Sequence, residues 1–277
     1  MTTFNLGVCT WALDRYDVLA AMRAAREKLD VSVAQIGFFG SDAVQNGSAE
    51  AISQAARALH MTVAGAFLGF DGEDYASISR VGETGGLAPD DRFRHRLDLL
   101  DHVAGIAVAC HAPSVAIHVG TIPADRHSPL WEKLLHRVRD AAKRLADRGL
   151  RLLLETGREP AATLATFVRA AQLPNLGVNF DPANFVIYGT DDPVRAMSAL
   201  KGLIELVHIK DAKASDRPGV DFGRRVPLGS GDAQIARVIS KLRVAGYTGP
   251  LLLEGYSREP DSDGLRAEAG YVQSLLG

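Results

Sequence analysis

Cysteine is scarce in this sequence and forms no cluster. Cys9 and Cys110 are the only two, and they lie far apart in apolar stretches with no metal-type spacing. This pattern argues against a disulfide-stapled secreted fold and against a cysteine-ligated zinc site. It predicts two buried free thiols in a reducing compartment, so the expected location is cytoplasmic.

Targeting signals and a strong charge of one sign are also missing. The N-terminus lacks a basic region, and the apolar run over residues 103–117 is broken by His111 and Pro113, so we predict neither a signal peptide nor a membrane span. The 31 basic and 33 acidic residues give a formal net charge of −2. Nothing in this balance favours nucleic acid or an anionic membrane, and a small-molecule partner is expected.

A glycine-rich dinucleotide-binding turn is absent after the first expected strand. The stretch Gly7-Val8-Cys9-Thr10-Trp11 contains no G-x-G-x-x-G, which argues against a doubly wound sheet. The chain instead alternates strand and helix patterns. Strands are expected at 4–9, 33–38, 61–67 and 115–118, followed by four that end at Glu155, Asp181, Lys210 and Glu254. Eight such units in 277 residues predict a (β/α)8 TIM barrel, an α/β fold, as a single domain over residues 1–277.

Two connections in this pattern are long. The segment 69–89 is rich in glycine and acidic residues, and Tyr75, Ile78 and Val81 give it side chains that can pack, so we interpret it as a lid. Pro89 is expected at the start of the next helix, a favoured position for proline. The segment 212–231 is interpreted as a polar inserted loop.

The stretch from Leu206 to Asp211 is apolar and turns polar at its end. Alternation along a strand places His208 and Lys210 on one face and Val207 and Ile209 on the other. Three other expected strands end in the same way on Glu155, Asp181 and Glu254. Any one of these could be an ordinary polar strand terminus. The carboxyl ends of barrel strands meet at one mouth, however, so four polar tips on successive strands predict one site.

This predicted site contains three carboxylates and one imidazole. Three carboxylates close together repel one another unless they bind protons or a cation, and a divalent metal resolves the conflict. The oxygen-rich donor set favours Mn²⁺, Mg²⁺ or Co²⁺ over a structural zinc, although Zn²⁺ stays an alternative. We expect one divalent ion per chain, with Mn²⁺ as the first choice.

Four residues near the expected mouth are candidates for substrate contact, and each has a simpler interpretation. Lys210 would contact substrate or form a salt bridge, and nearby acids argue against a Schiff-base role because they keep it protonated. Asn184 is a substrate hydrogen-bond partner or a turn residue. His118 contacts substrate or is a satisfied core histidine, and Trp11 forms an apolar wall for a substrate or simply packs.

Three arginines in expected loops are candidates for binding an anionic group. They are Arg158, Arg224 and Arg225. Solvated loop charges are the simpler interpretation.

Several motifs in the C-terminal half resemble those of the xylose-isomerase-like TIM-barrel superfamily, which includes hydroxypyruvate isomerase, ketose 3-epimerases and endonuclease IV. The motifs are Leu153-Leu154-Glu155-Thr156, Asn179-Phe180-Asp181-Pro182-Ala183-Asn184, Val207-His208-Ile209-Lys210-Asp211, Pro227-Leu228-Gly229-Ser230-Gly231-Asp232 and Leu253-Glu254-Gly255-Tyr256. The N-terminal half fits by its architecture and by His118-Val119-Gly120.

The resemblance implies a metal-dependent sugar isomerase or epimerase. Glu155, Asp181, His208 and Glu254 would hold the ion, and Glu155 and Glu254 would be the acid/base pair that removes and returns a proton α to a carbonyl through an enediolate. Family habit also suggests a homo-oligomer, with the lid completed by a neighbour.

Departures from the family pattern narrow this expectation. Asn184 stands where many ketose epimerases and endonuclease IV have histidine, and the segment 222–227 lacks the aspartate and histidine of the nuclease, which argues against DNA repair. Two alternatives stay open beside the isomerase. One is a lyase or dehydratase that acts on a keto-sugar or 3-keto-glycoside with the same site, and the other is a non-catalytic sugar-binding barrel.

Overall fold

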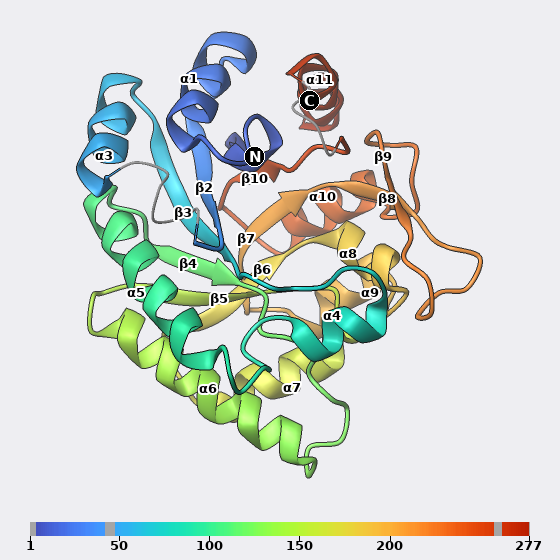
Figure 1. Cartoon of the computed structure of the whole chain (residues 1–277). Helices are drawn as coiled ribbons and strands as arrows, with labels where there is room; N and C mark the ends of the chain where they lie inside the picture. Colours follow the sequence, from blue (N-terminus) through green and yellow to red (C-terminus); the bar gives the residue numbers. More distant parts are fainter. Residues whose placement is uncertain (1–3, 42–47, 258–261, 277) are drawn as a thin grey trace.

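The computed structural model describes residues 4–41, 48–257 and 262–276, and its centre is a closed barrel of parallel strands (Figure 1). The strands follow the order β1-β10-β7-β6-β5-β4-β3-β2 around the barrel, which confirms the predicted (β/α)8 fold. They are β1 (Leu6–Cys9), β2 (Val33–Phe39), β3 (Thr62–Gly69), β4 (Ser114–Ile117), β5 (Arg151–Glu155), β6 (Leu176–Phe180), β7 (Ile204–Ile209) and β10 (Leu251–Leu253).

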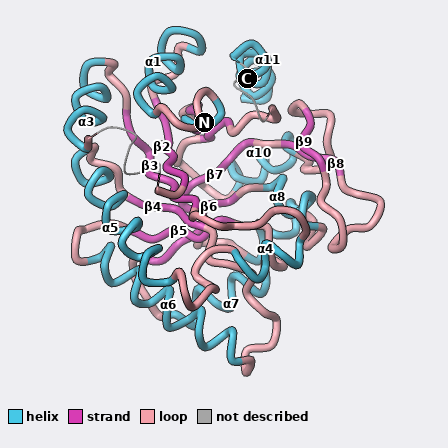
Figure 2. The backbone as a smooth tube through the Cα atoms, in the orientation of Figure 1, coloured by secondary structure: helices cyan, strands magenta, loops and turns pink. Residues whose placement is uncertain are grey.

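Helices lie around the outside of these strands (Figure 2). Several helices have a serine or aspartate N-cap whose side chain accepts a backbone N–H. Asp17 accepts from Ala20, and Ser48 accepts from Ala51. The helices are α1 (Val18–Leu29), α3 (Ala49–Ala58), α4 (Ile78–Thr84), α5 (Phe93–Ala109), α6 (Pro129–Ala146), α7 (Ala161–Ala171), α8 (Pro182–Tyr188), α9 (Pro193–Ala199), α10 (Ile235–Val244) and α11 (Ser262–Leu276), with a 3-10 turn η1 at Thr10–Ala12.

Apolar side chains form two layers, because successive strand residues point to opposite faces. The larger cluster lies between the strands and the helices and includes Val207 and Ile209. A smaller one fills the barrel interior and consists of Cys9, Phe67, Ala116, Leu153, Leu206 and Leu252. Glu155, His208 and Glu254 come two positions after members of this inner cluster and therefore also face inward. They are three of the four residues of the predicted site.

Three expectations about the connections were wrong. The segment 69–89 is not a loop throughout, because Ser77 caps the short helix α4. The following helix begins at Phe93 and not at Pro89, because the carbonyls of residues 87–89 accept hydrogen bonds from Arg137 and hold this stretch outside the helix.

The third correction concerns the segment 212–231. It is not simply a loop, because β8 (Asp211–Lys213) and β9 (Arg224–Val226) pair as a small antiparallel sheet. The buried Asp211 carboxylate fixes this insertion by accepting the backbone N–H groups of Ala212, Gly229, Gly231 and Ala233.

A buried arginine anchors the lid segment to the barrel wall. Arg96 of α5 is fully buried, and its guanidinium donates to the carbonyls of Asp71, Thr84 and Gly86. The two ends of the lid are thus tied to the same side chain. The lid has a defined structure within this single chain.

The structure also bears on the two cysteines and on membrane-spanning helices. Cys9 and Cys110 are both free and buried, as predicted. Among the described residues, no helix combines the length and the apolar character needed to cross a bilayer.

Candidate metal centre

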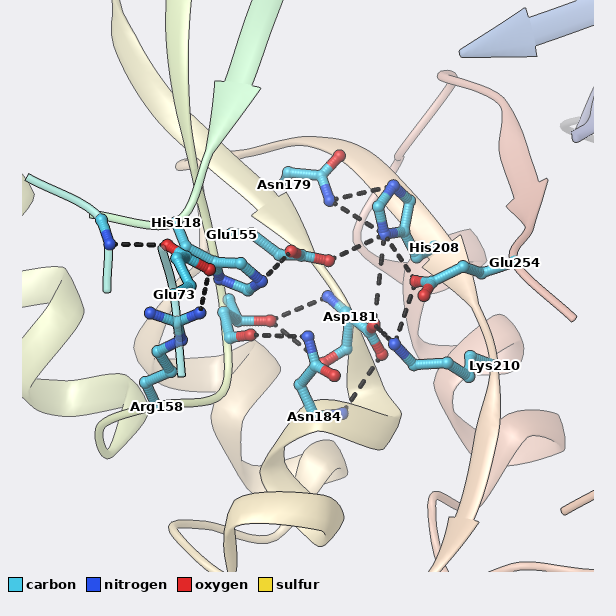
Figure 3. Close-up of polar contacts among 12 residues, drawn as sticks. Glu73, His118, Glu155, Arg158, Asn179, Asp181, Asn184, His208, Lys210 and Glu254 are labelled. Carbon is cyan, nitrogen blue, oxygen red and sulfur yellow. Dashed lines mark hydrogen bonds and ion pairs between the residues drawn. The ribbon is translucent and has the colours of Figure 1, made fainter. Parts of the chain in front are cut away.

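Four side chains from four strand ends converge inside the mouth of the barrel (Figure 3). Glu155 ends β5, Asp181 follows β6, His208 is in β7 and Glu254 follows β10. Each offers one ligand atom, and these atoms all lie within 4.8 Å of one another. All four residues are buried. The structure therefore brings together the four residues that the strand pattern singled out.

Asp181 is oriented by the helix that follows it. Its Oδ1 accepts the N–H groups of Ala183 and Asn184 and so caps α8, which leaves Oδ2 to face the cluster. The backbone of Asp181 is fixed as well. Its N–H donates to the Thr156 hydroxyl at 2.8 Å, and its carbonyl accepts from that hydroxyl at 3.0 Å.

The two glutamates approach His208 from either side. Nδ1 of His208 lies 2.9 Å from Oε1 of Glu155 and 3.2 Å from Oε2 of Glu254. The second oxygen of each glutamate is held by a basic side chain. Oε2 of Glu155 is 2.7 Å from Nε2 of His118, and Oε1 of Glu254 is 2.9 Å from an Nη atom of Arg225.

Lys210 lies within the same cluster. Its Nζ is 2.6 Å from Asp181 Oδ2 and 2.9 Å from Glu254 Oε2. Burial alone would lower the pKa of Lys210, but the charges of Asp181 and Glu254 raise it, so the side chain is an ammonium ion. The sequence left open whether Lys210 contacts substrate or forms a salt bridge. The structure shows salt bridges, to Asp181 and Glu254.

The three carboxylates have different pKa values despite their proximity. Burial would raise the pKa of Glu155 and of Glu254, but basic neighbours, His118 and His208 for Glu155 and Lys210 and Arg225 for Glu254, hold both well below the usual range. For Asp181, burial and then the charges of the two glutamates outweigh Lys210 and raise the pKa to about 6. The three buried carboxylates thus share the positive charges of Lys210, Arg225 and His208.

A divalent cation fits this donor set. Three carboxylate oxygens and one imidazole nitrogen match the ligands that Mn²⁺, Mg²⁺ and related ions take in proteins, and the four ligand atoms lie within 4.8 Å of one another. The four residues could hold such an ion.

The remaining predicted residues lie around this cluster. His118 follows β4 and contacts Glu155 directly. Asn184 is in the first turn of α8, where its side-chain amide donates to the Thr156 carbonyl at 3.2 Å. Trp11 packs edge-on against His208, with ring centroids 5.7 Å apart, and also contacts Phe67. Their roles toward a substrate stay predictions.

Two of the loop arginines are not solvated charges, so that interpretation was wrong for them. Arg225 reaches Glu254 from β9. The Arg158 side chain is 2% exposed, and it donates to Glu73 and to the Tyr75 hydroxyl of the lid. Arg224 is exposed, as expected.

One residue of the site was missed altogether. Gln35 of β2 is fully buried, and its Oε1 lies 2.6 Å from Nε2 of His208. The only signal in the sequence was a polar residue within an otherwise apolar strand.

Comparison with known families agrees with this geometry. The model of the xylose isomerase-like TIM barrel family matches residues 24–275. The chain belongs to this family. This member has a buried acidic cluster that could bind a metal.

Solved structures with the family fold cover nearly the whole chain. A xylose isomerase domain protein from Planctomyces limnophilus is 28% identical, with a TM-score of 0.87 over 99% of this chain and 96% of that one. A xylose isomerase-like TIM barrel protein from Mycobacterium smegmatis, in complex with magnesium, is 14% identical, with a TM-score of 0.70 and coverage of 99% and 97%. The 3-keto-D-glucoside 4-epimerase from E. coli is 17% identical, with a TM-score of 0.72 and coverage of 98% and 99%. No curated protein matches this sequence.

Proposed function

We propose that this family member is a divalent-metal-dependent isomerase or epimerase of a sugar or keto-sugar. The observation that carries the proposal is the arrangement of the two glutamates. Each has one oxygen in the cluster of ligand atoms and a second oxygen held outside it by a basic side chain. The metal-bound relative from M. smegmatis supports the cation, and the E. coli epimerase supports a keto-sugar as substrate.

Glu155 and Glu254 act as the acid/base pair in this proposal. Their low pKa values keep both as carboxylates at neutral pH, so either can accept a proton from the carbon next to a carbonyl. A bound cation supplies positive charge that stabilises the negative charge developing on the substrate oxygens. Return of the proton by the second glutamate gives an epimer, and return to the adjacent carbon gives an isomer.

Other residues at the mouth orient the substrate in this proposal. Lys210 is an ammonium donor beside Glu254, and His118 is a ring donor beside Glu155. Trp11 offers an apolar surface next to His208, and Asn184 is an amide in the first turn of α8.

The first experiment measures metal content by elemental mass spectrometry on protein purified without chelator. Wild type should hold about one divalent ion per chain, and His208→Asn and Asp181→Asn should lose it. No bound metal, and no binding of added Mn²⁺, Mg²⁺, Co²⁺ or Zn²⁺ to wild type, would contradict the proposal.

The second experiment follows proton exchange in D₂O, by NMR, for a panel of ketoses and 3-keto-glucosides. Saturated with Mg²⁺ or Zn²⁺, wild type should exchange the α-proton of its substrate, and Glu155→Gln and Glu254→Gln should lower the rate by about 10²- to 10⁴-fold. Glu205→Gln, at the far end of the barrel, is the matched control and should leave the rate unchanged. Product that has lost water or an aglycone would indicate a lyase instead, and ligand binding without exchange would indicate a binding protein.

A further inference from the structure

A contact across the barrel interior fixes the orientation of His208. Nε2 of His208, on β7, is 2.6 Å from Oε1 of Gln35, on β2, although the two residues are 173 positions apart in the chain. Both side chains are fully buried. The other ring nitrogen, Nδ1, faces Glu155 and Glu254.

The amide of Gln35 has one favourable orientation. Its Nε2 donates to the Ala66 carbonyl on β3 at 3.4 Å, so Oε1 is the atom that faces His208. The reverse orientation would place the amide oxygen against a carbonyl oxygen. The Cys9 thiol lies 4.0 Å from the same Oε1 and is a weak donor to it.

An amide oxygen accepts hydrogen bonds and cannot donate them, so Nε2 of His208 must carry a hydrogen. Asn179 does not compete for this role. Its Nδ2 is 3.2 Å from one ring nitrogen and 3.3 Å from the other, so it is not aligned with the lone pair of either. With Nε2 protonated, Nδ1, on the side of the carboxylates, is the nitrogen that would offer a lone pair to a bound cation.

We propose that Gln35 is a positioning residue of the metal centre, which holds His208 as the Nε2–H tautomer and directs Nδ1 to the cation. The inference rests on the proposed metal-dependent function. It assigns a role in cation binding to the β1–β3 side of the barrel, which supplies none of the four ligands. Partners that orient a ligating histidine typically change metal affinity by about 10- to 100-fold when they are removed.

The test measures cation affinity and not turnover. Gln35→Met removes the acceptor but keeps an unbranched side chain of similar length, and its dissociation constant for Zn²⁺ or Mn²⁺, measured by calorimetry or chelator competition, should rise about 10- to 100-fold. Gln35→Glu keeps an oxygen opposite Nε2 and should stay within about threefold of wild type or bind more tightly. Gln54→Met, on the exposed face of α3, is the matched glutamine control and should have no effect.

A measurement on wild type covers the case in which Gln35→Met does not fold. In Zn²⁺-loaded protein with ¹⁵N-labelled histidine, NMR should show His208 with Nε2 protonated and Nδ1 bound to the ion, with its signals assigned by their loss in His208→Asn. An Nε2-bound ion, or equal affinity of wild type and Gln35→Met, would overturn the inference about Gln35 alone. Failure of wild type to bind any cation would instead overturn the proposed function.

Discussion

The chemistry of the candidate site depends on how each buried acid is surrounded. Glu155 and Glu254 each have basic neighbours that keep their pKa low, whereas Asp181 shares Lys210 with Glu254 and has a raised pKa. The pKa values of these carboxyl groups thus differ because their surroundings differ. The two low-pKa acids are those assigned to proton transfer, and the aspartate is assigned to cation binding alone.

Another buried acid, Glu159, lies outside this cluster and forms no ion pair with any residue that the structure describes. Its Oε2 accepts the N–H of Ile122, at 3.3 Å, while the adjacent Arg158 pairs with Glu73. Burial raises the pKa of Glu159 to about 8, against the opposing effects of that N–H and of Arg158. At neutral pH this side chain is mostly a neutral carboxylic acid.

We predict that Glu159 makes the fold less stable as the pH rises. Because its pKa is higher in the folded than in the unfolded chain, the folded state binds more protons between about pH 4.5 and pH 8, and the free energy of unfolding falls over that window. In urea unfolding, the free energy of unfolding of wild type should fall by on the order of a few kcal/mol between pH 5 and pH 8.5 because of Glu159. Glu159→Gln should remove this fall. Exposed Glu27→Gln is the control. The prediction fails if wild type and Glu159→Gln have parallel pH profiles.

The individual ligands could be predicted from sequence, but their partners could not. Each ligand is marked by a local pattern, an apolar run that ends on a polar residue, and the closure of parallel strands brings such ends together. The contacts of Gln35 with His208 and of Arg158 with Glu73 join residues far apart in the chain. No local pattern carries that information, so Gln35 was missed and Arg158 was interpreted as a surface charge.

At the scale of elements, two buried arginines hold the lid segment, residues 69–89, in place. Arg96 ties both lid ends to α5, and Arg158, after β5, pairs with Glu73 near the start of the segment at 3.2 Å. Glu73 in turn accepts the N–H of Gly86 at 2.6 Å. Gly85 leaves room for this arrangement, because a side-chain carbon there would lie 2.2 Å from Nη1 of Arg158.

We predict that the Arg158–Glu73 pair is worth far more than a surface ion pair. Arg158→Met would leave Glu73 buried and unpaired, and the free energy of unfolding should fall by about 3–5 kcal/mol. The double variant Glu73→Gln with Arg158→Met removes both charges and should recover most of this loss. Urea unfolding and limited proteolysis within residues 70–89 are the measurements.

An exposed pair provides the control for that experiment. Arg217 and Asp221 are in contact at 2.7 Å on the surface, and Arg217→Ala should change the free energy of unfolding by less than about 1 kcal/mol. Equal losses for Arg158→Met and Arg217→Ala, or no recovery in the double variant, would contradict a stabilising role for the buried Arg158–Glu73 pair.

Element boundaries followed from sequence where the pattern was long, apart from the start of α5, and not where it was short. The barrel strands and the long helices were predicted by their apolar periodicity. Helices α4 and α8 have seven residues each, and β8 and β9 have three, which is too short for a periodic pattern. These short elements are stabilised by tertiary contacts, such as the four N–H groups that Asp211 accepts.

At the scale of the whole molecule, the candidate centre takes its ligands from the C-terminal half of the barrel, whose last strand pairs with the first. The ligands come from β5, β6, β7 and β10, and β10 pairs with β1 to close the barrel. Three of the four strand ends carry carboxylates that repel one another. A cation bound there should therefore stabilise the closed barrel as a unit.

We predict that a divalent cation raises the thermal stability of the whole chain. A ligand that binds only the folded state at about 100 times its dissociation constant adds about 2.7 kcal/mol to the free energy of unfolding. For a chain of this size that corresponds to an increase in Tm of roughly 5 °C. Calorimetry with added Mn²⁺ should show one shifted transition in wild type, reversed by EDTA. His208→Asn should show no shift, and an equal shift in this variant would place the stabilising ion elsewhere.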